Sequence, residues 1–479
     1  MRKNFLLVGA MLVAGTFLGA DVAKAADIKF SGSAMARYEA LGRDFNDSTA
    51  IDSQVGSRIR LNATANIDEK TSAFLQLQSA GVWGDTAATT PTNANPSGLN
   101  RGGAAASDGL ADVGFHQAYF TLKNFYELPV DVQVGRQEVI LDGHRLLGNT
   151  VWTLGMQAHD AIRVTHSAGD HTLAYVWSAV QEGGTDAGNN KTDFSAHIFW
   201  GNFKGIGGGA LSLYYILADI NDNVLNAGST FSDNDFHTVG FRQAGTLAGF
   251  DYRGEFYYQF GAADGAAAQQ TIKAGSWDRS AFMIGARIGK KFGPLSATLW
   301  YDYLSGTDEK DIDSNKVGSF DTVFDTGHKF YGLMDRFLTI GTTSRTAGGS
   351  VQSDNVKGLG LQDYALKLGY TVNSQWTAKV DAHSFYTAED SYTAADTVGA
   401  TGAVATTLAN GKSNDNKNHL GEEVDLTVIH KYSASTNIVF GYSHFFAASL
   451  GNELLGNLSA TSTVNDDADW AYIMMDVKF

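Results

Sequence analysis

Short segments in which apolar and polar residues alternate fill this chain, and that two-residue period limits what it can fold into. In residues 57–67, Ile59 and Leu61 share one face, while Arg58 and Arg60 share the other. Such alternation is typical of a β-strand whose two faces meet different surroundings. About 18 segments of the chain show it. The sequence therefore predicts an all-β fold, with strands near 28–40, 57–67, 72–78, 114–122, 129–137, 156–166, 171–178, 193–201, 210–217, 237–243, 249–259, 280–290, 295–303, 362–370, 375–383, 420–430, 436–445 and 470–479.

The connections between these segments alternate in length. Short connections occur at 68–70, 167–170, 371–374 and 432–435, whereas 79–113, 138–155, 304–361 and 384–418 are long. Short turns at one end and long loops at the other are typical of outer-membrane β-barrels. Because lipid offers the backbone no hydrogen-bond partner, a sheet that spans a membrane must close on itself. We therefore expect a single antiparallel transmembrane barrel with short periplasmic turns and long extracellular loops. A secreted β-sandwich would explain the alternation but not the unequal connections.

Both ends of the sequence indicate export to an outer membrane. Arg2 and Lys3 precede a short apolar run, and Ala-Lys-Ala at 23–25 fits a small-residue cleavage site. We expect a Sec-type signal peptide over 1–25 and the barrel over 26–479. The last segment ends on Phe479, which resembles the signal that barrel-assembly machinery recognises. The expected location is the outer membrane of a Gram-negative cell envelope.

Composition excludes several function classes. The net charge of −16 argues against nucleic acid as a partner, and the absence of cysteine excludes disulfide scaffolds and thiolate sites. The acidity is concentrated in the long loops, as in Asp466, Asp467 and Asp469. Such clusters can be a solvated rim, or can bind divalent ions that bridge to lipopolysaccharide. No loop has the spacing of an EF-hand, so we predict no metal site and no cofactor.

The polar faces of the strands carry many charges that a closed barrel would point into its lumen. They can pair across strands and fill a wet interior, or the cations can attract anionic solutes, since rings of charge set pore selectivity. Arginine suits carboxylates because its planar fork binds them bidentately. The predicted lumen-lining residues are Arg37, Arg58, Arg60, Arg242, Arg253, Arg287, Lys367, Lys379, Asp251, Glu255, Asp381, Glu423 and Asp425.

Three regions resemble the alginate-export family of outer-membrane barrels. They are Gly-Arg-Gln-Glu-Val-Ile-Leu-Asp-Gly-His-Arg-Leu-Leu-Gly at 135–148, the segment 301–335 with its Tyr-Asp-Tyr-Leu-Ser-Gly-Thr-Asp start, and the closing region from His-Leu-Gly-Glu-Glu-Val-Asp-Leu at 419–426 onward. The resemblance implies a monomeric 18-stranded barrel, narrowed by loops and lined by arginines that pass an anionic polysaccharide. It also makes Arg136, Arg145 and Arg163 the candidates for the pore constriction.

The function predicted from the sequence is passive passage of hydrophilic, anionic solutes or polysaccharide, without enzymatic activity. A general small-solute porin without anion preference is an alternative, and an outer-membrane hydrolase is another. Against the hydrolase, His159 and His166 are separated by an odd number of residues and would point to opposite faces of a strand. The chain also has no Gly-x-Ser-x-Gly motif.

Overall fold

A computed structural model describes residues 27–42, 51–83, 113–181, 194–220, 231–265, 275–308, 310–311, 314–337, 358–390, 418–455 and 467–479. The predicted signal peptide at 1–25 lies outside the described residues, as does most of the predicted loop at 79–113. Most of the predicted loop at 384–418 also lies outside them.

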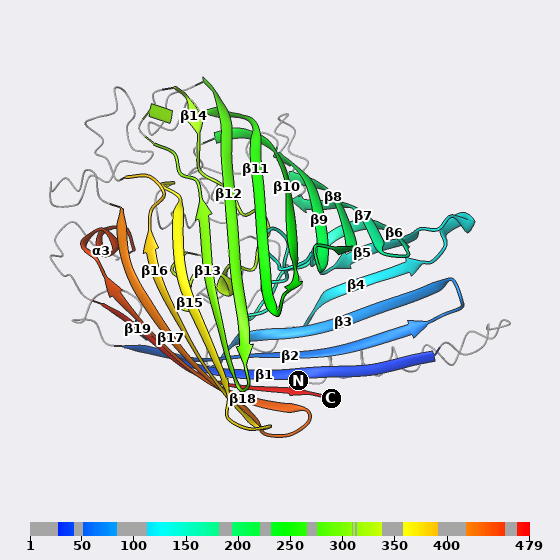
Figure 1. Cartoon of the computed structure of the whole chain (residues 1–479). Helices are drawn as coiled ribbons and strands as arrows, with labels where there is room; N and C mark the ends of the chain where they lie inside the picture. Colours follow the sequence, from blue (N-terminus) through cyan, green and yellow to red (C-terminus); the bar gives the residue numbers. More distant parts are fainter. Residues whose placement is uncertain are drawn as a thin grey trace.

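The described residues form one antiparallel β-barrel (Figure 1). Its first nine strands are β1 (Asp27–Gly42), β2 (Asp52–Asn66), β3 (Thr71–Val82), β4 (Gly114–Leu122), β5 (Asp131–Gln137), β6 (His159–Ala168), β7 (His171–Gln181), β8 (Phe194–Ile206) and β9 (Gly209–Ile220). The second nine are β10 (Phe231–Leu247), β11 (Phe250–Gly265), β12 (Gly275–Phe292), β13 (Leu295–Leu304), β15 (Leu361–Thr371), β16 (Trp376–Tyr386), β17 (His419–Lys431), β18 (Thr436–Ala447) and β19 (Ala468–Lys478).

Each strand pairs with the next along the chain, and β19 pairs with β1 to close the sheet. Tyr38 lies opposite Ile473 in that closing pair, and the backbones of Gly32 and Phe479 exchange two hydrogen bonds of 2.7 and 3.0 Å. The two-residue strand β14 (Lys316–Val317) adds a parallel pairing to β12, outside the closed circuit. The predicted 18-stranded antiparallel barrel is therefore confirmed.

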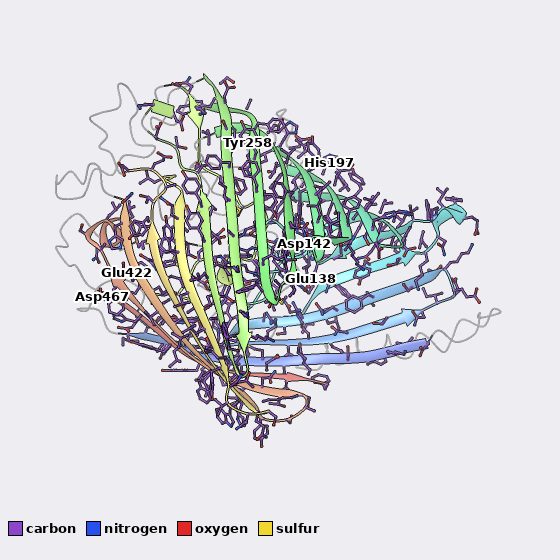
Figure 2. The ribbon with its side chains drawn as sticks, in the orientation of Figure 1. Glu138, Asp142, His197, Tyr258, Glu422 and Asp467 are labelled. Atoms are coloured by element: carbon purple, nitrogen blue, oxygen red, sulfur yellow. The ribbon has the colours of Figure 1, made fainter. Side chains whose placement is uncertain are left out.

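The two faces of the wall are those of a membrane barrel. On β2, the outward-facing Ile59 and Leu61 are 51% and 44% exposed, whereas the inward-facing Arg60 is 8% exposed. Apolar side chains thus cover the outside and charged ones the inside, the reverse of a water-soluble sandwich. Figure 2 shows side chains on both surfaces of the wall, with Glu138 and Asp142 inside the barrel.

Helical structure in the described residues comprises the 3₁₀ turns η2 (Phe125–Glu127) and η3 (Gly327–Lys329), the short helix α3 (Ser449–Leu455) and residues 310–311. Within the same residues, no helix has both the length and the apolar character needed to cross a membrane.

Several strands extend further than the alternation predicts. β10 spans Phe231–Leu247 where the alternation predicts 237–243, and β12 spans Gly275–Phe292 where it predicts 280–290. Most of the additional residues, 231–236 and 275–279, lie next to long loops and include polar residues and glycines. A strand that projects beyond the lipid has water on both faces, so its sequence loses the alternation on which the prediction relies.

Wall packing depends on close approach at Gly441. A Cβ atom at this position would lie 1.9 Å from the ring of Tyr472 on the neighbouring strand. We expect Gly441→Val to destabilise the barrel by about 1–3 kcal/mol through overpacking. Heat-modifiable gel mobility and thermal unfolding measure this. Gly254→Ala is the matched control, because a Cβ atom there would have no neighbour within 4 Å. Equal stability of the two variants would contradict the packing argument.

Candidate functional site

Two loops fold back into the lumen instead of projecting outward. Residues 138–158 connect β5 to β6, and residues 305–337 begin the connection from β13 to β15. They join through backbone hydrogen bonds of 2.8 Å from Gly148 N to Phe324 O and of 2.8 Å from Phe324 N to Leu146 O. A further bond of 3.0 Å runs from Thr326 N to His144 O. We call the described residues of these two loops the plug.

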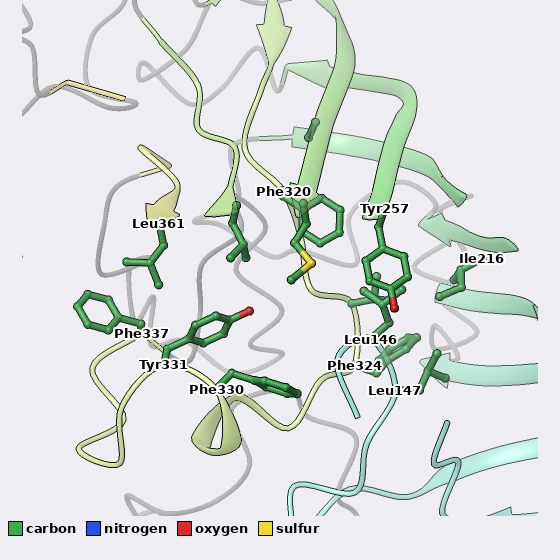
Figure 3. Close-up of a cluster of buried hydrophobic side chains, with 14 of the residues drawn as sticks. Leu146, Leu147, Ile216, Tyr257, Phe320, Phe324, Phe330, Tyr331, Phe337 and Leu361 are labelled. Atoms are coloured by element: carbon green, nitrogen blue, oxygen red, sulfur yellow. The ribbon is translucent and has the colours of Figure 1, made fainter. Parts of the chain in front are cut away.

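The plug has an apolar core of its own. Phe320, Phe324, Phe330 and Tyr331 are at most 2% exposed, and they lie with Leu146 and Leu147 in the interior of the barrel (Figure 3). Burying such side chains against each other and against the inner wall removes a large apolar area from water. We predicted that the loops 79–113, 138–155 and 304–361 narrow the lumen. The described residues of the second and third loops give this prediction a structural basis, while most of 79–113 lies outside the described residues.

Arg145 fastens the plug to the wall. Its Nε lies 3.0 Å from Glu255 of β11, and its Nη2 lies 2.6 Å from Asp302 of β13. Nη1 donates a 2.8 Å hydrogen bond to the hydroxyl of Tyr331, and the guanidinium lies 3.7 Å from the ring centre of Phe330. Burial by itself lowers the pKa of Arg145, but the charges of Asp302, Tyr331 and Glu255 raise it well above its usual value. Arg145 is 2% exposed and fully paired, so it joins the two loops to the wall and offers no free charge to a solute.

Three arginines of β1 and β2 bind the first loop of the plug. The guanidinium of Arg37 pairs with Glu39 at 3.0 Å, lies 4.0 Å from the ring centre of Trp152, and donates to its carbonyl at 2.9 Å. Arg58 donates to the carbonyls of Val151, Thr153 and Leu154. Arg60 donates to Gln78 at 2.7 Å and lies 3.5 Å from Glu138. Two of these cations hold carbonyls of the loop, and the third holds its first carboxylate.

Acids of β17 bind the second loop. Glu423 accepts a 2.9 Å hydrogen bond from the backbone of Met334, and Asp425 accepts one of 3.3 Å from Leu333. A side chain at Gly332 would meet Glu423, with a Cβ atom 2.5 Å from Oε1. The carboxylates thus hold a close backbone turn, in which Gly332 has a φ of +80°.

Other predicted lumen residues face inward and are paired. Arg253 lies 3.3 Å from both Glu255 and Asp302 and 4.0 Å from the ring centre of Trp300. Lys367 pairs with Asp381 at 2.9 Å. Arg242 is 3.6 Å from Asp142 of the plug. Asp251, near the start of β11, accepts a 2.6 Å hydrogen bond from Thr246.

A smaller set of cations has no carboxylate partner in the described residues. Arg163 on β6, Arg287 on β12, Lys379 on β16 and Lys329 of the plug form no ion pair with any residue that the structure describes. The pKa of Lys329 lies below its usual value because of partial burial and then the positive charges of Arg287 and Arg242. Burial followed by the charge of Lys329 also lowers the pKa of His144. Lys329 is therefore within electrostatic range of Arg242 on β10 and of Arg287 on β12.

The three predicted constriction arginines have different positions. Arg136 pairs with Asp160 at 3.0 Å, and Asp160 lies on the outer face of β6 with 62% of its side chain exposed. The prediction that Arg136 lines the pore is wrong, because it shares the outer face of β5 with Val132 and Val134. Arg145 is inside but enclosed by the plug. Arg163 faces inward on β6 without a partner among the described residues, and its role in selectivity stays a prediction.

Sequence reasoning did not single out Lys329, Asp142 or Glu138. All three lie in loops, where no periodicity indicates which way a side chain points. A usable signal was present for Arg136, since the run Val132, Val134, Arg136 places it with apolar residues.

At the outer rim, Asp467 and Asp469 lie 3.5 and 2.9 Å from the imidazole of His444. The predicted cluster also includes Asp466, which lies outside the described residues. The described residues contain no group of three or more acids and histidines arranged to hold a metal ion.

The model of the alginate-export family matches residues 27–454. The chain belongs to this family. The resemblance predicted from the three sequence regions is therefore confirmed. No curated protein sequence matches the chain significantly.

Solved outer-membrane Occ porins share the fold. OccK8 (OprE) of Pseudomonas aeruginosa is 11% identical, with a TM-score of 0.52 over 95% of this chain and 98% of its own. OccAB3 of Acinetobacter baumannii is 11% identical, with a TM-score of 0.56 over 95% and 99%. OccK2 (OpdF) of Pseudomonas aeruginosa, solved in complex with glucuronate, is 11% identical, with a TM-score of 0.52 over 95% and 98%. With the family, this fold identifies a channel for hydrophilic solutes in the Gram-negative outer membrane.

Replacing Arg145 by Met tests whether it fastens the plug. The variant leaves Glu255 and Asp302 buried with only Arg253 as a counter-charge, and breaking such a buried pair costs up to about 3–5 kcal/mol. We expect a lower unfolding temperature and larger, noisier single-channel currents. Arg163→Met is the control for stability, since Arg163 has no ion pair with a described residue. Unchanged currents and stability in Arg145→Met would show that the plug is held elsewhere.

The rim contains one carboxyl group with a strongly shifted acidity. Half-burial, followed by the charges of Asp308, Asp311 and Asp390, raises the pKa of Glu389 to about 7. Because the folded-state pKa is raised, folding is favoured most at low pH. The contribution of Glu389 to the free energy of unfolding is lost as the pH rises from about 4.5, the usual pKa of a glutamate, through about 7. Glu389→Gln should flatten the dependence of the unfolding temperature between pH 5 and 8. An unaltered slope would contradict the assignment to Glu389.

Proposed function

We propose that the barrel is a passive, non-enzymatic channel that prefers small hydrophilic anions, with carboxylates as the favoured class. The observation that carries this proposal is the set of unpaired inward cations. Most lumenal arginines are neutralised by carboxylates or occupied by loop carbonyls, but Arg163, Arg287, Lys329 and Lys379 have no carboxylate partner among the described residues. A solute that passes them meets net positive charge, which lowers the free energy of an anion relative to a cation.

The plug favours small solutes over a polysaccharide. Its aromatic core and the Arg145 network fill part of the lumen with closely packed side chains. A polymer would need the plug to move, whereas a small anion can pass beside it. The glucuronate bound to OccK2 is a monomeric sugar acid of this kind. An alginate-like polymer is the second candidate, supported by the family to which the chain belongs.

The hydrolase alternative receives little support from the Ser–His contact between β6 and β7. Nδ1 of His159 lies 3.0 Å from the hydroxyl of Ser178, and His159 packs edge-on against Phe324 of the plug. Ser178 is fully buried, so its hydroxyl cannot reach a substrate. A catalytic serine must lie within reach of the bond that it attacks.

The partners expected from the sequence remain part of this proposal. The barrel would sit as a monomer in outer-membrane lipid and lipopolysaccharide, and Phe479 would be read by the assembly machinery. Phe479 has an exposed side chain, while its backbone hydrogen-bonds to Gly32.

Reversal potentials in planar bilayers under a salt gradient test the anion preference. We expect the wild-type channel to favour chloride and small carboxylates over potassium. The triple variant Arg163→Gln, Arg287→Gln, Lys329→Gln should lower the anion-to-cation permeability ratio several-fold, toward that of a neutral pore.

Lys290→Gln is the matched control, because Lys290 lies over the outward-facing rings of Phe250 and Phe292 and outside the lumen. A triple variant with wild-type selectivity would eliminate Arg163, Arg287 and Lys329 as the filter. Conductance without any ion preference would favour the general porin instead.

A further inference from the structure

The outer face of β7 to β11 carries a continuous band of aromatic rings. Tyr175 lies 4.7 Å from Phe199, and Phe199 lies 5.8 Å from Tyr215. His237 stacks 4.9 Å from Phe260, which is 6.1 Å from Tyr258. These are distances between ring centres. We call Tyr175, His197, Phe199, Tyr215, His237, Tyr258 and Phe260 the outer band.

A hydrogen bond with the same geometry repeats along this band. The hydroxyl of Tyr175 on β7 lies 2.9 Å from Nδ1 of His197 on β8. The hydroxyl of Tyr215 on β9 lies 2.9 Å from Nδ1 of His237 on β10. In both pairs the partners lie diagonally across two neighbouring antiparallel strands. The next strand pair repeats the diagonal with Tyr258 and Ser280 at 3.0 Å, where a hydroxyl replaces the imidazole.

The Tyr–His hydrogen bond occupies Nδ1 of each imidazole and leaves Nε2 for an outside partner. When the hydroxyl donates to Nδ1, the neutral ring carries its proton on Nε2; when the ring is protonated, the hydroxyl accepts from Nδ1–H and Nε2 still carries a proton. Neither Nε2 atom has a hydrogen-bond partner among the described residues, and neither is a buried unpaired atom. Each pair therefore directs one N–H donor outward, and the donor becomes charged when the ring is protonated.

The band lies toward the long-loop end of the barrel. His197 is the fourth residue of β8 after the long connection that precedes it, and Tyr258 is the ninth residue of β11 after the short turn at its start. Figure 2 places His197 and Tyr258 in that part of the wall. Aromatic residues at this height of a membrane barrel lie at the level of the lipid headgroups. In the outer membrane, the outward leaflet at the long-loop end is lipopolysaccharide, whose lipid A headgroup carries phosphates.

We propose that His197 and His237 bind the phosphates of lipopolysaccharide on the outer face of the barrel. The ligand class is an anionic phosphate monoester at the headgroup level, and the donor is Nε2–H of each imidazole. A protonated imidazole complements a phosphate in charge and donates a charge-assisted hydrogen bond. The neighbouring Phe199 and Phe260 are 48% and 39% exposed and supply the apolar contact for the acyl chains below. Tyr175 and Tyr215 are positioning residues, because they orient the rings.

Native mass spectrometry of the purified full chain tests the proposal. The protein is titrated with diphosphorylated lipid A, with monophosphorylated lipid A and with phosphatidylglycerol. We expect the wild-type barrel to bind diphosphorylated lipid A about tenfold or more tightly than phosphatidylglycerol, as one or two charge-assisted bonds imply. The double variant His197→Phe, His237→Phe keeps the aromatic stacking and removes both donors. It should lose that preference.

Tyr258→Phe is the matched control, since it removes a hydroxyl from the same band where no imidazole is present. Heat-modifiable gel mobility checks that each variant folds. If the double variant fails to fold, the variant Tyr175→Phe, Tyr215→Phe replaces it. That variant should bind lipid A more weakly, because the imidazole rings lose the hydroxyls that orient them. Unchanged lipid A binding in a folded double variant overturns the proposal. An equal loss for lipid A and phosphatidylglycerol also overturns it, because the rings would then act without regard to the phosphate.

Discussion

Closure of the backbone hydrogen-bond ladder is the constraint on which the rest of this structure depends. In lipid an open sheet edge would leave a row of N–H and C=O groups without partners, each at a cost of several kcal/mol. The pairing of β1 with β19, completed by Gly32 and Phe479, removes both edges. Once the sheet is closed, its outer face must be apolar and its interior becomes a wide, water-accessible space. The scarcity of proline fits this design, since each strand must supply its donors to a ladder.

The interior then has to be filled without a conventional core. The two loops of the plug fill part of the interior, and charged side chains of the wall bind these loops through ion pairs and hydrogen bonds. Arg145 reaches from the plug to Glu255 and Asp302, while Arg58 and Glu423 reach from the wall to loop backbone atoms. Removing a charge from water is expensive unless it is paired. The buried arginines are therefore those with carboxylate or carbonyl partners, while Lys329 and Lys379, which have no carboxylate partner among the described residues, remain exposed.

The separation of the lumenal cations into paired and unpaired ones suggests how a channel of this family can be both stable and selective. If all lumenal arginines served selectivity, none would hold the loops that narrow the pore. Here Arg37, Arg58, Arg60 and Arg145 bind the plug, and the anion preference that we propose rests on a separate set that includes Arg163 and Arg287. The plug residue Lys329 belongs to the same set. In this proposal, the conformation of the loop sets both the width and the charge of the pathway.

The sequence by itself determined the strands, the faces of most of their residues and the family. Those features follow from a two-residue period, which lipid on one side and water on the other impose on every strand. Arg136 shows that the same period has to be applied residue by residue, because Val132 and Val134 place it outside although a motif suggested the pore. Only the tertiary structure decided which charges pair, that Arg145 is enclosed, and that Lys329 lies near Arg287. Ion pairs such as Arg145 with Asp302 join residues far apart in the sequence across a closed space, and a loop has no period from which its side-chain directions could be predicted.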